Sequence, residues 1–259
     1  GKISFQTEKV TRNSMTDVVV ATGTVEPVTK VDVGTQVSGI IDRIYVDYNS
    51  VVKKGQLIAE MDKVTLQAEL ESQEAQLANA KAEYEYQQKN YARSKVLFEK
   101  QLISDSDYEE ATYNYEKAKS TYEKSKADIV KVRRNLGYAV ITSPIDGVVI
   151  SREVEEGQTV AAGFETPTLF TIAKDLTEMQ VIADVDEADI GEIREGQRVT
   201  FTVDAYRNDA FEGVVTQVRL EATVESNVVT YEVVISAPNP DLKLKPGLTA
   251  TVSIYTLEK

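Results

Sequence analysis

Two stretches of the sequence are weak copies of each other: "GIIDRIYVDYNSVVKKG" (Gly39 to Gly55) and "GVVISREVEEGQTVAAG" (Gly147 to Gly163). In the alignment the glycines coincide at both ends, and Asn49 falls on Gly157. Asn and Gly both tolerate positive φ, so the match predicts a left-handed turn residue at the same place in each copy. Neither copy has enough apolar residues to fold alone. We therefore predict that the copies are two halves of one small β-sandwich.

The segment between the copies is predicted to be a pair of helices. It is rich in Ala, Glu, Gln, Lys and Leu, which are strong helix formers. Large residues recur with heptad spacing in both arms, which is typical of a two-stranded coiled coil. In the first arm the large residues are Leu70, Leu77, Tyr84, Tyr91 and Phe98, and the other seam position holds the small or amide residues Gln73, Ala80, Gln87 and Ser94. In the second arm large and small residues alternate at Tyr108, Ala111, Tyr115, Ala118, Tyr122, Ser125, Ile129 and Val132.

A single turn-like break, "KQLISDSD" (Lys100 to Asp107), separates the two arms. Such a short connection favours an antiparallel hairpin. Asp105 or Ser106 is predicted to cap the second helix, and Asp62 the first. Because the paired arms return to their starting point, the hairpin is an insertion that brings the two copies together.

The composition excludes several classes of protein. The 259 residues include no Cys, His or Trp, and the formal net charge is −13. Without Cys or His the chain cannot form a Ser-His or Cys-His catalytic pair, or a zinc site with His and Cys ligands. An acidic surface repels phosphate backbones, so no nucleic-acid partner is expected. We expect a non-enzymatic protein with no catalytic residues, no cofactor and no metal.

The last third of the chain is predicted to be a small antiparallel β-barrel. Apolar and polar residues alternate in several short segments, which is typical of half-buried strands. Examples are "VTFTV", "YEVVI" and "ATVSI". The N-terminal "FQTEKVTRNSMTDVVVATGTVEP" is predicted to form one or two strands that lead into the first copy.

These motifs carry a family resemblance. "SGIIDRIYVDYNSVVKKGQLIAEMD" and "SPIDGVVISREVEEGQTV" resemble the halves of a biotinyl/lipoyl domain. Such a domain, split by a helical hairpin, resembles the periplasmic adaptor (membrane fusion) proteins of tripartite efflux pumps, of the HlyD type. "ADVDEADIGEIREGQRVTFTVDAY", "VVTYEVVI" and "LKPGLTATVSI" resemble the barrel of MacA-type macrolide-efflux adaptors.

The resemblance implies an elongated, multidomain protein of mixed α and β structure. Its expected parts are N-terminal strands leading into a barrel or membrane-proximal domain, a split lipoyl-like sandwich, an inserted coiled-coil hairpin and a β-barrel. The corresponding ranges are 1–30, then 31–62 with 137–173, then 63–136, then 174–259. In the family the N-terminal strands join a membrane-proximal domain, which the resemblance implies is incomplete or absent here.

The resemblance also implies a binding site at the hairpin tip. In "YARSKVLFEKQLIS", Arg93, Leu97 and Ser104 match the Arg-Leu-Ser motif with which such adaptors meet a TolC-like outer-membrane channel. Arg93 and Leu97 are one helical turn apart and share a face. A structural role is the alternative: Leu97, Leu102 and Ile103 would close the end of the rod, and Ser104 would cap the second helix.

The implied partners are an inner-membrane transporter, of the ABC type (MacB-like) or the RND type, and further copies in a ring, as a hexamer. The implied location is the periplasm, with an inner-membrane anchor that is absent from this chain. One departure from the family concerns the loop "AAGFETPT". MacA-type adaptors carry glutamines there that narrow the ring, whereas this chain has Phe164 and Glu165.

Two other readings remain open at the level of sequence. Asp62-Lys63 resembles the modified lysine of carrier domains, and a lipoyl or biotinyl group on Lys63 would make the protein a carrier subunit. The second reading is the adaptor of a type I secretion exporter, which shares the general plan but has a much longer hairpin.

Overall fold

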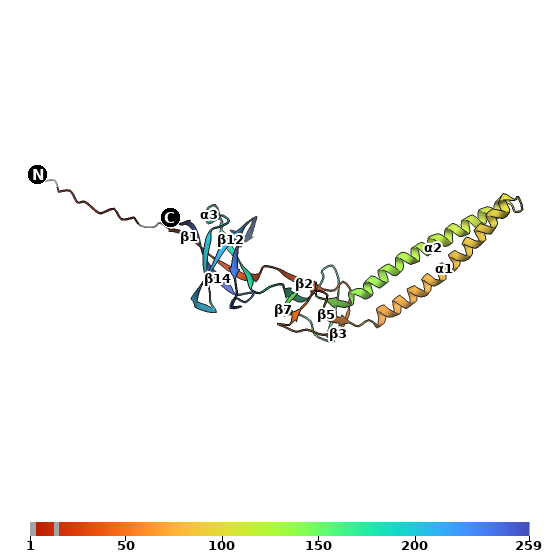
Figure 1. Cartoon of the computed structure of the whole chain (residues 1–259), viewed down its shortest axis with the longest axis horizontal. Helices are drawn as coiled ribbons and strands as arrows, with labels where there is room; N and C mark the ends of the chain where they lie inside the picture. Colours follow the sequence, from red (N-terminus) through yellow and green to blue (C-terminus); the bar gives the residue numbers. More distant parts are fainter. Residues whose placement is uncertain (1–3, 13–15, 259) are drawn as a thin grey trace. The chain divides into compact units, whose positions relative to one another are not determined.

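A computed structural model describes residues 4–12 and 16–258 of the chain. These residues form two compact units. One unit combines the two ends of the chain, the residues up to Lys30 and those from Ala173 onward, and the other is Val31–Ile172. Figure 1 shows the β-strands of each unit and the two long helices of the second.

The first unit is a closed antiparallel barrel of six strands in the order β1-β10-β13-β12-β11-β14. The strands are β1 (Thr16–Pro27), β10 (Glu178–Asp186), β11 (Arg198–Val203), β12 (Tyr206–Glu225), β13 (Val228–Pro238) and β14 (Thr249–Glu258), with the short helix α3 (Glu187–Ile190) after β10. Buried and exposed residues alternate along β10 and β14, because successive side chains of a strand point to opposite faces. The inward set, which includes Phe201, Val233 and Ile254, forms the core.

The strand predicted within the N-terminal segment is part of this barrel. β1 pairs with β10 on one side and with β14 on the other, and so it closes the ring. Residues 4–12 form neither helix nor strand, and the predicted strand residues 13–15 lie outside the described residues.

The second unit contains two four-stranded sheets, and each sheet takes strands from both sequence copies. One has the order β2-β9-β7-β4 and the other β6-β5-β3-β8. From the first copy and its flanks come β2 (Lys30–Gly34), β3 (Gly39–Ile44), β4 (Val51–Val52) and β5 (Leu57–Met61), and from the second come β6 (Val140–Thr142), β7 (Gly147–Arg152), β8 (Thr159–Val160) and β9 (Thr168–Ala173). A shared core includes Ile41 and Val149, which occupy equivalent places in the two copies.

The two copies are related by an internal two-fold symmetry that is visible in their hydrogen bonds. Gly157 N donates to Ile41 O at 2.7 Å, and Asn49 N donates to Val149 O at the same distance. Each bond is the image of the other under the sequence alignment. Asn49 has φ 70° and Gly157 has φ 87°, so the predicted left-handed turn residue is present in both copies.

The symmetry ends at one loop of the second copy. Tyr45 N donates to Ile58 O, whereas the equivalent Glu153 N donates to Leu169 O, which lies three residues further along the alignment. The extra residues belong to the loop that contains Phe164, whose side chain is fully exposed. The second copy therefore carries a surface loop that the first copy lacks.

The hairpin consists of α1 (Val64–Glu99) and α2 (Asp105–Tyr138), which lie side by side in Figure 1. The predicted heptad positions form the interface. Ala80, Ala111, Ala118, Ile129 and Val132 are buried there, and the large residues of α1 are half-buried. The amide oxygens of Gln73 and Gln87, also at predicted seam positions, are enclosed without a hydrogen-bond partner among the described residues.

Aromatic rings from the two helices stack alternately along the seam. The order is Phe98, Tyr108, Tyr91, Tyr115, Tyr84 and Tyr122, with ring centroids 4.4–6.0 Å apart. Such pairs contribute about 0.5–1.5 kcal/mol each beyond the burial of their area. The Tyr91 and Tyr108 hydroxyls lie 3.3 Å apart. This hydrogen bond, followed by desolvation, raises the pKa of Tyr91. The ladder is the main side-chain contact between the helices near the tip.

Candidate partner-binding tip of the helical hairpin

The tip is built on a left-handed helix stop. Gln101 has φ 59° and follows the last turn of α1. Gln101 N donates to Phe98 O, and Leu102 N donates to Leu97 O at 2.8 Å. These two bonds define a Schellman motif, which usually carries Gly at the left-handed position and an apolar contact between the positions of Leu97 and Leu102. The motif turns the chain sharply after α1.

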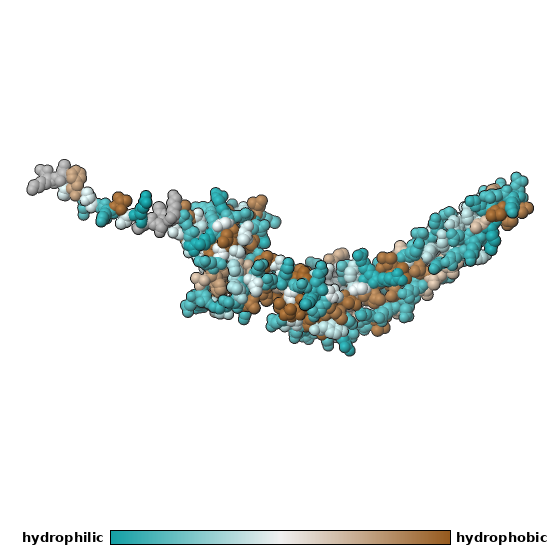
Figure 2. Space-filling model, viewed as in Figure 1, coloured by the Kyte–Doolittle hydropathy of each residue, from teal (hydrophilic) through white to brown (hydrophobic). Residues whose placement is uncertain are grey.

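Apolar side chains remain exposed at this turn. Leu102 is 66% exposed, Val96 49% and Leu97 39%. Figure 2 shows hydrophobic residues gathered at the free end of the hairpin, beyond a surface that is mostly hydrophilic. Inside the turn, the rings of Phe98 and Tyr108 stack at 4.4 Å and close the seam. Since that stack already closes the seam, the exposed leucines are available to a partner.

Arg93 lies on the exposed surface of α1, one turn before Leu97. The seam positions nearby are Tyr91, Ser94 and Phe98, so Arg93 is directed away from α2. Its guanidinium has no hydrogen bond or ion pair with any residue that the structure describes. A planar fork of free donors next to apolar side chains suits a partner that presents carbonyl or carboxylate oxygens.

Ser104 has the structural role considered in the sequence analysis. It is the N-cap of α2, with φ −72° and ψ 159°, and its hydroxyl accepts a hydrogen bond from Asp107 N at 3.1 Å. The prediction that Asp105 or Ser106 would be the cap is wrong. Asp105 instead lies in the first turn of α2, where its negative charge interacts favourably with the positive end of the helix dipole. The Ser104 hydroxyl keeps its proton for a second hydrogen bond.

The structure therefore brings all three predicted residues to the hairpin end, Arg93 and Leu97 on α1 and Ser104 at the start of α2. It adds Val96 and Leu102 as exposed apolar neighbours. Sequence reasoning used Leu102 only to close the rod and did not consider Val96. The sequence indicates the exposure of Val96 and Leu102 by their position, because both are apolar residues outside the heptad seam and are not buried between the helices.

Lys63 lies between β5 and α1, in the N-cap position, with φ −102° and no side-chain cap. The residue before it does satisfy the helix start, because Val64 N donates to Asp62 Oδ1 at 2.9 Å. Lys63 Nζ is 3.6 Å from Glu60 Oε2. The lysine thus follows a strand and opens a helix, and it does not occupy a tight turn between two strands.

Within residues 4–12 and 16–258, no cluster of three or more carboxylates is arranged to hold a metal ion. No helix in this part of the chain combines the length and hydrophobicity that a membrane crossing requires.

The comparisons with known proteins agree with this geometry. Residues 29–172 match the family model described as "RND MFP, barrel-sandwich hybrid domain", and residues 181–257 match "CusB-like, beta-barrel domain". The macrolide export protein MacA of Yersinia pestis is 33% identical over 97% of this chain and 71% of its own length. The pyoverdine export membrane fusion protein PvdR of Pseudomonas putida is 35% identical over 97% of this chain and 73% of its own length.

Among solved structures, MacA from Actinobacillus actinomycetemcomitans superimposes with a TM-score of 0.81 and 32% identity. The match covers 98% of this chain and 83% of that one. The split sheets, the inserted hairpin and the family models point to one conclusion: the chain belongs to the membrane fusion protein family, the periplasmic adaptors of tripartite efflux pumps.

Proposed function

We propose that this chain links an inner-membrane transporter to a TolC-like outer-membrane channel, and that the hairpin tip is the surface that meets the channel. The observation that carries the proposal is the exposure of Arg93, Leu97 and Leu102 at the free end of a hairpin that is otherwise held together by its own seam. A tip with apolar side chains and one unpaired Arg fits a groove between the helical ends of a partner.

In this proposal the parts have separate tasks. Residues 31–62 and 137–173 form a lipoyl-like sandwich, residues 63–136 form the hairpin, and residues 174–259 with the N-terminal strand form a small barrel. Several copies assemble into a ring, as a hexamer, in which the hairpins surround a duct. The protein works in the periplasm and is held at the inner membrane.

For the transporter we propose the ABC type, MacB-like. The likeness to MacA extends over nearly the whole chain, which supports this choice. The RND type is the second candidate, because the matching family model is described as an RND membrane fusion protein. Purification of the full-length adaptor from membranes, followed by identification of the bound transporter, separates the two. The relatives are named for macrolides and for pyoverdine, so family membership alone does not fix the exported compound.

The tip is tested by reversing the charge of Arg93. We expect Arg93→Asp to abolish drug resistance in cells that depend on this adaptor, and to prevent co-purification of the outer-membrane channel. The matched control is Lys81→Asp, which makes the same charge change on an exposed position of α1 three turns further from the tip. Both variants should keep the helix content of the parent chain.

If the folded Arg93→Asp protein supports resistance as well as the parent does, the tip does not bind as proposed. If Lys81→Asp loses activity equally, the effect comes from the general charge of the hairpin, and the proposal also fails.

A further inference from the structure

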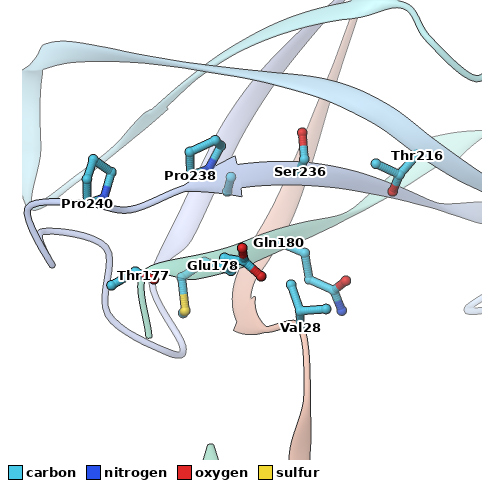
Figure 3. A pocket seen from close by; sticks show the side chains of 10 residues that line it. Val28, Thr177, Glu178, Gln180, Thr216, Ser236, Pro238 and Pro240 are labelled. Atoms are coloured by element: carbon cyan, nitrogen blue, oxygen red, sulfur yellow. The ribbon is translucent and has the colours of Figure 1, made fainter. Parts of the chain in front are cut away.

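The barrel carries a cavity that has no part in the proposed tip contact. Its volume is about 660 Å³, within the range of roughly 300–1,000 Å³ that is usual for sites of small organic molecules. The walls come from the start of β10, the end of β13, Thr216 on β12 and Val28 after β1. Figure 3 shows Glu178, Gln180 and Val28 close together, with Ser236 and Pro238 on the neighbouring strand β13.

The strand register explains why these side chains meet outside the barrel core. Glu178 is opposite Pro238, and Gln180 is opposite Ser236, on paired strands β10 and β13. The residues between them, Met179 and Ala237, point into the core and are buried. A bulge at Thr216 bends β12 where it pairs with β13, and this part of β12 forms the third side of the cavity.

Most polar atoms around the cavity are already satisfied. Ser236 Oγ accepts from Val214 N at 3.0 Å, and Thr216 Oγ1 donates to Val234 O at 3.1 Å. Thr177 Oγ1 donates to Asp175 at 2.6 Å. Because their polar atoms are already bonded, these residues present mostly hydrocarbon surface to a ligand. Val28, Pro238 and Pro240 add further apolar surface to the cavity. An apolar body would gain from burial against it.

Two polar side chains differ from the rest. The Glu178 carboxylate and the Gln180 amide form no hydrogen bond or ion pair with any residue in the described part of the chain. Glu178 is also the only charged residue among those that line the cavity. The wall thus combines hydrocarbon with one negative charge and one neutral hydrogen-bonding group.

We propose that this cavity binds an amphipathic organic cation of drug size. Its apolar body lies against Val28, Pro238 and Pro240, its positive group faces Glu178, and a polar substituent reaches Gln180. Anions of the same shape are rejected by Glu178 and by the net charge of −13. This site is a property of the barrel alone and does not depend on the proposed docking of the hairpin tip.

The test uses two dyes that share a xanthene body and differ in charge, rhodamine 6G (cationic) and fluorescein (anionic). We expect saturable binding of rhodamine 6G to the purified chain by fluorescence polarisation, and no saturable binding of fluorescein. Glu178→Gln keeps the shape of the wall and should weaken rhodamine binding by about fivefold, the effect of one partly exposed charge. Thr216→Trp should fill the cavity and remove binding.

The matched control is Glu221→Gln, which removes an exposed carboxylate elsewhere on β12 and should leave rhodamine binding unchanged. Circular dichroism and thermal unfolding of each variant establish that the barrel is folded. Absence of saturable rhodamine binding overturns the proposal, and so does equal binding of fluorescein. Binding that survives Thr216→Trp lies elsewhere, and binding that survives Glu178→Gln undiminished does not require the cation; either result also overturns it.

Discussion

The aromatic ladder should make neighbouring tyrosines of one helix differ greatly in their contribution to stability. Tyr84 stacks on Tyr115 with centroids 5.9 Å apart and on Tyr122 at 5.3 Å. Tyr86, two residues later on the same helix, is 58% exposed. Both can be changed to Ala, with the same gain in intrinsic helix propensity, so the difference between them reports packing alone.

The magnitude follows from the contacts. Two stacked pairs at about 1 kcal/mol each, with about 1–2 kcal/mol for burial of the ring, give a loss of roughly 3–4 kcal/mol for Tyr84→Ala. Tyr86→Ala loses none of these stacks and should change the free energy of unfolding by less than about 0.5 kcal/mol.

The assay is urea denaturation followed by circular dichroism at 222 nm. That signal reports the hairpin, because α1 and α2 have 36 and 34 residues and α3 has only 4. Tyr84→Ala should lower the midpoint of the transition strongly at an unchanged slope. Equal midpoints for the two variants would refute the role of the ladder in holding the helices together.

Three further predictions concern other parts of the molecule. Gln101→Gly should stabilise the hairpin by about 0.5–1 kcal/mol in the same urea assay, because φ 59° is costly for any residue with a Cβ; a loss of stability would contradict this. Asn239→Ala should destabilise the barrel by about 3 kcal/mol in calorimetry, since the buried amide makes three hydrogen bonds, two of them with Leu244, and a change under 1 kcal/mol would show that they contribute little. At alkaline pH the hairpin should lose helix, because the pKa of Tyr91 is raised in the folded state and the protonated side chain therefore stabilises the fold. This stabilisation is complete below the ordinary tyrosine pKa of about 10 and is lost as pH rises through the raised pKa. Tyr91→Phe, which cannot ionise, should reduce the pH dependence of the circular dichroism signal, and an unchanged profile would contradict the assignment.

The sequence was most informative where a pattern repeats. The alignment of the two copies predicted the left-handed residues Asn49 and Gly157, because a backbone that follows the same path twice needs permissive residues at the same points. The heptads predicted the seam for a similar reason, since only residues spaced by three and four face the partner helix.

Local chemistry at the tip was harder to predict. Several polar residues follow one another from Ser104 to Asp107, and each is able to cap a helix, so propensity alone could not select Ser104. The left-handed residue Gln101 gave no signal, because glutamine is uncommon in that conformation. The membership of β1 in the barrel depends on pairing with β14 at the opposite end of the chain, which no local pattern records.

The barrel cavity is beyond sequence reasoning for a related physical reason. Its walls come from segments around positions 28, 178, 216 and 238, and none of them contains a recognisable motif. Only the strand register brings Glu178 opposite Pro238. The three predicted tip residues were easier to find, because they lie in one continuous segment, from Arg93 to Ser104, that resembles a family motif.

The order of strands in the barrel has a consequence for biosynthesis. In the sequence, the hairpin is inserted between the two halves of the split sheets, and these halves are inserted between β1 and the remaining barrel strands. The hairpin depends on contacts that are close in sequence and can form as soon as α2 has been made. By contrast, β1 precedes the other barrel strands in the sequence, and one of its two neighbours, β14, follows all of them. We therefore expect the molecule to fold from its middle outward, with one edge of β1 unpaired and prone to wrong pairing until β14 has been made.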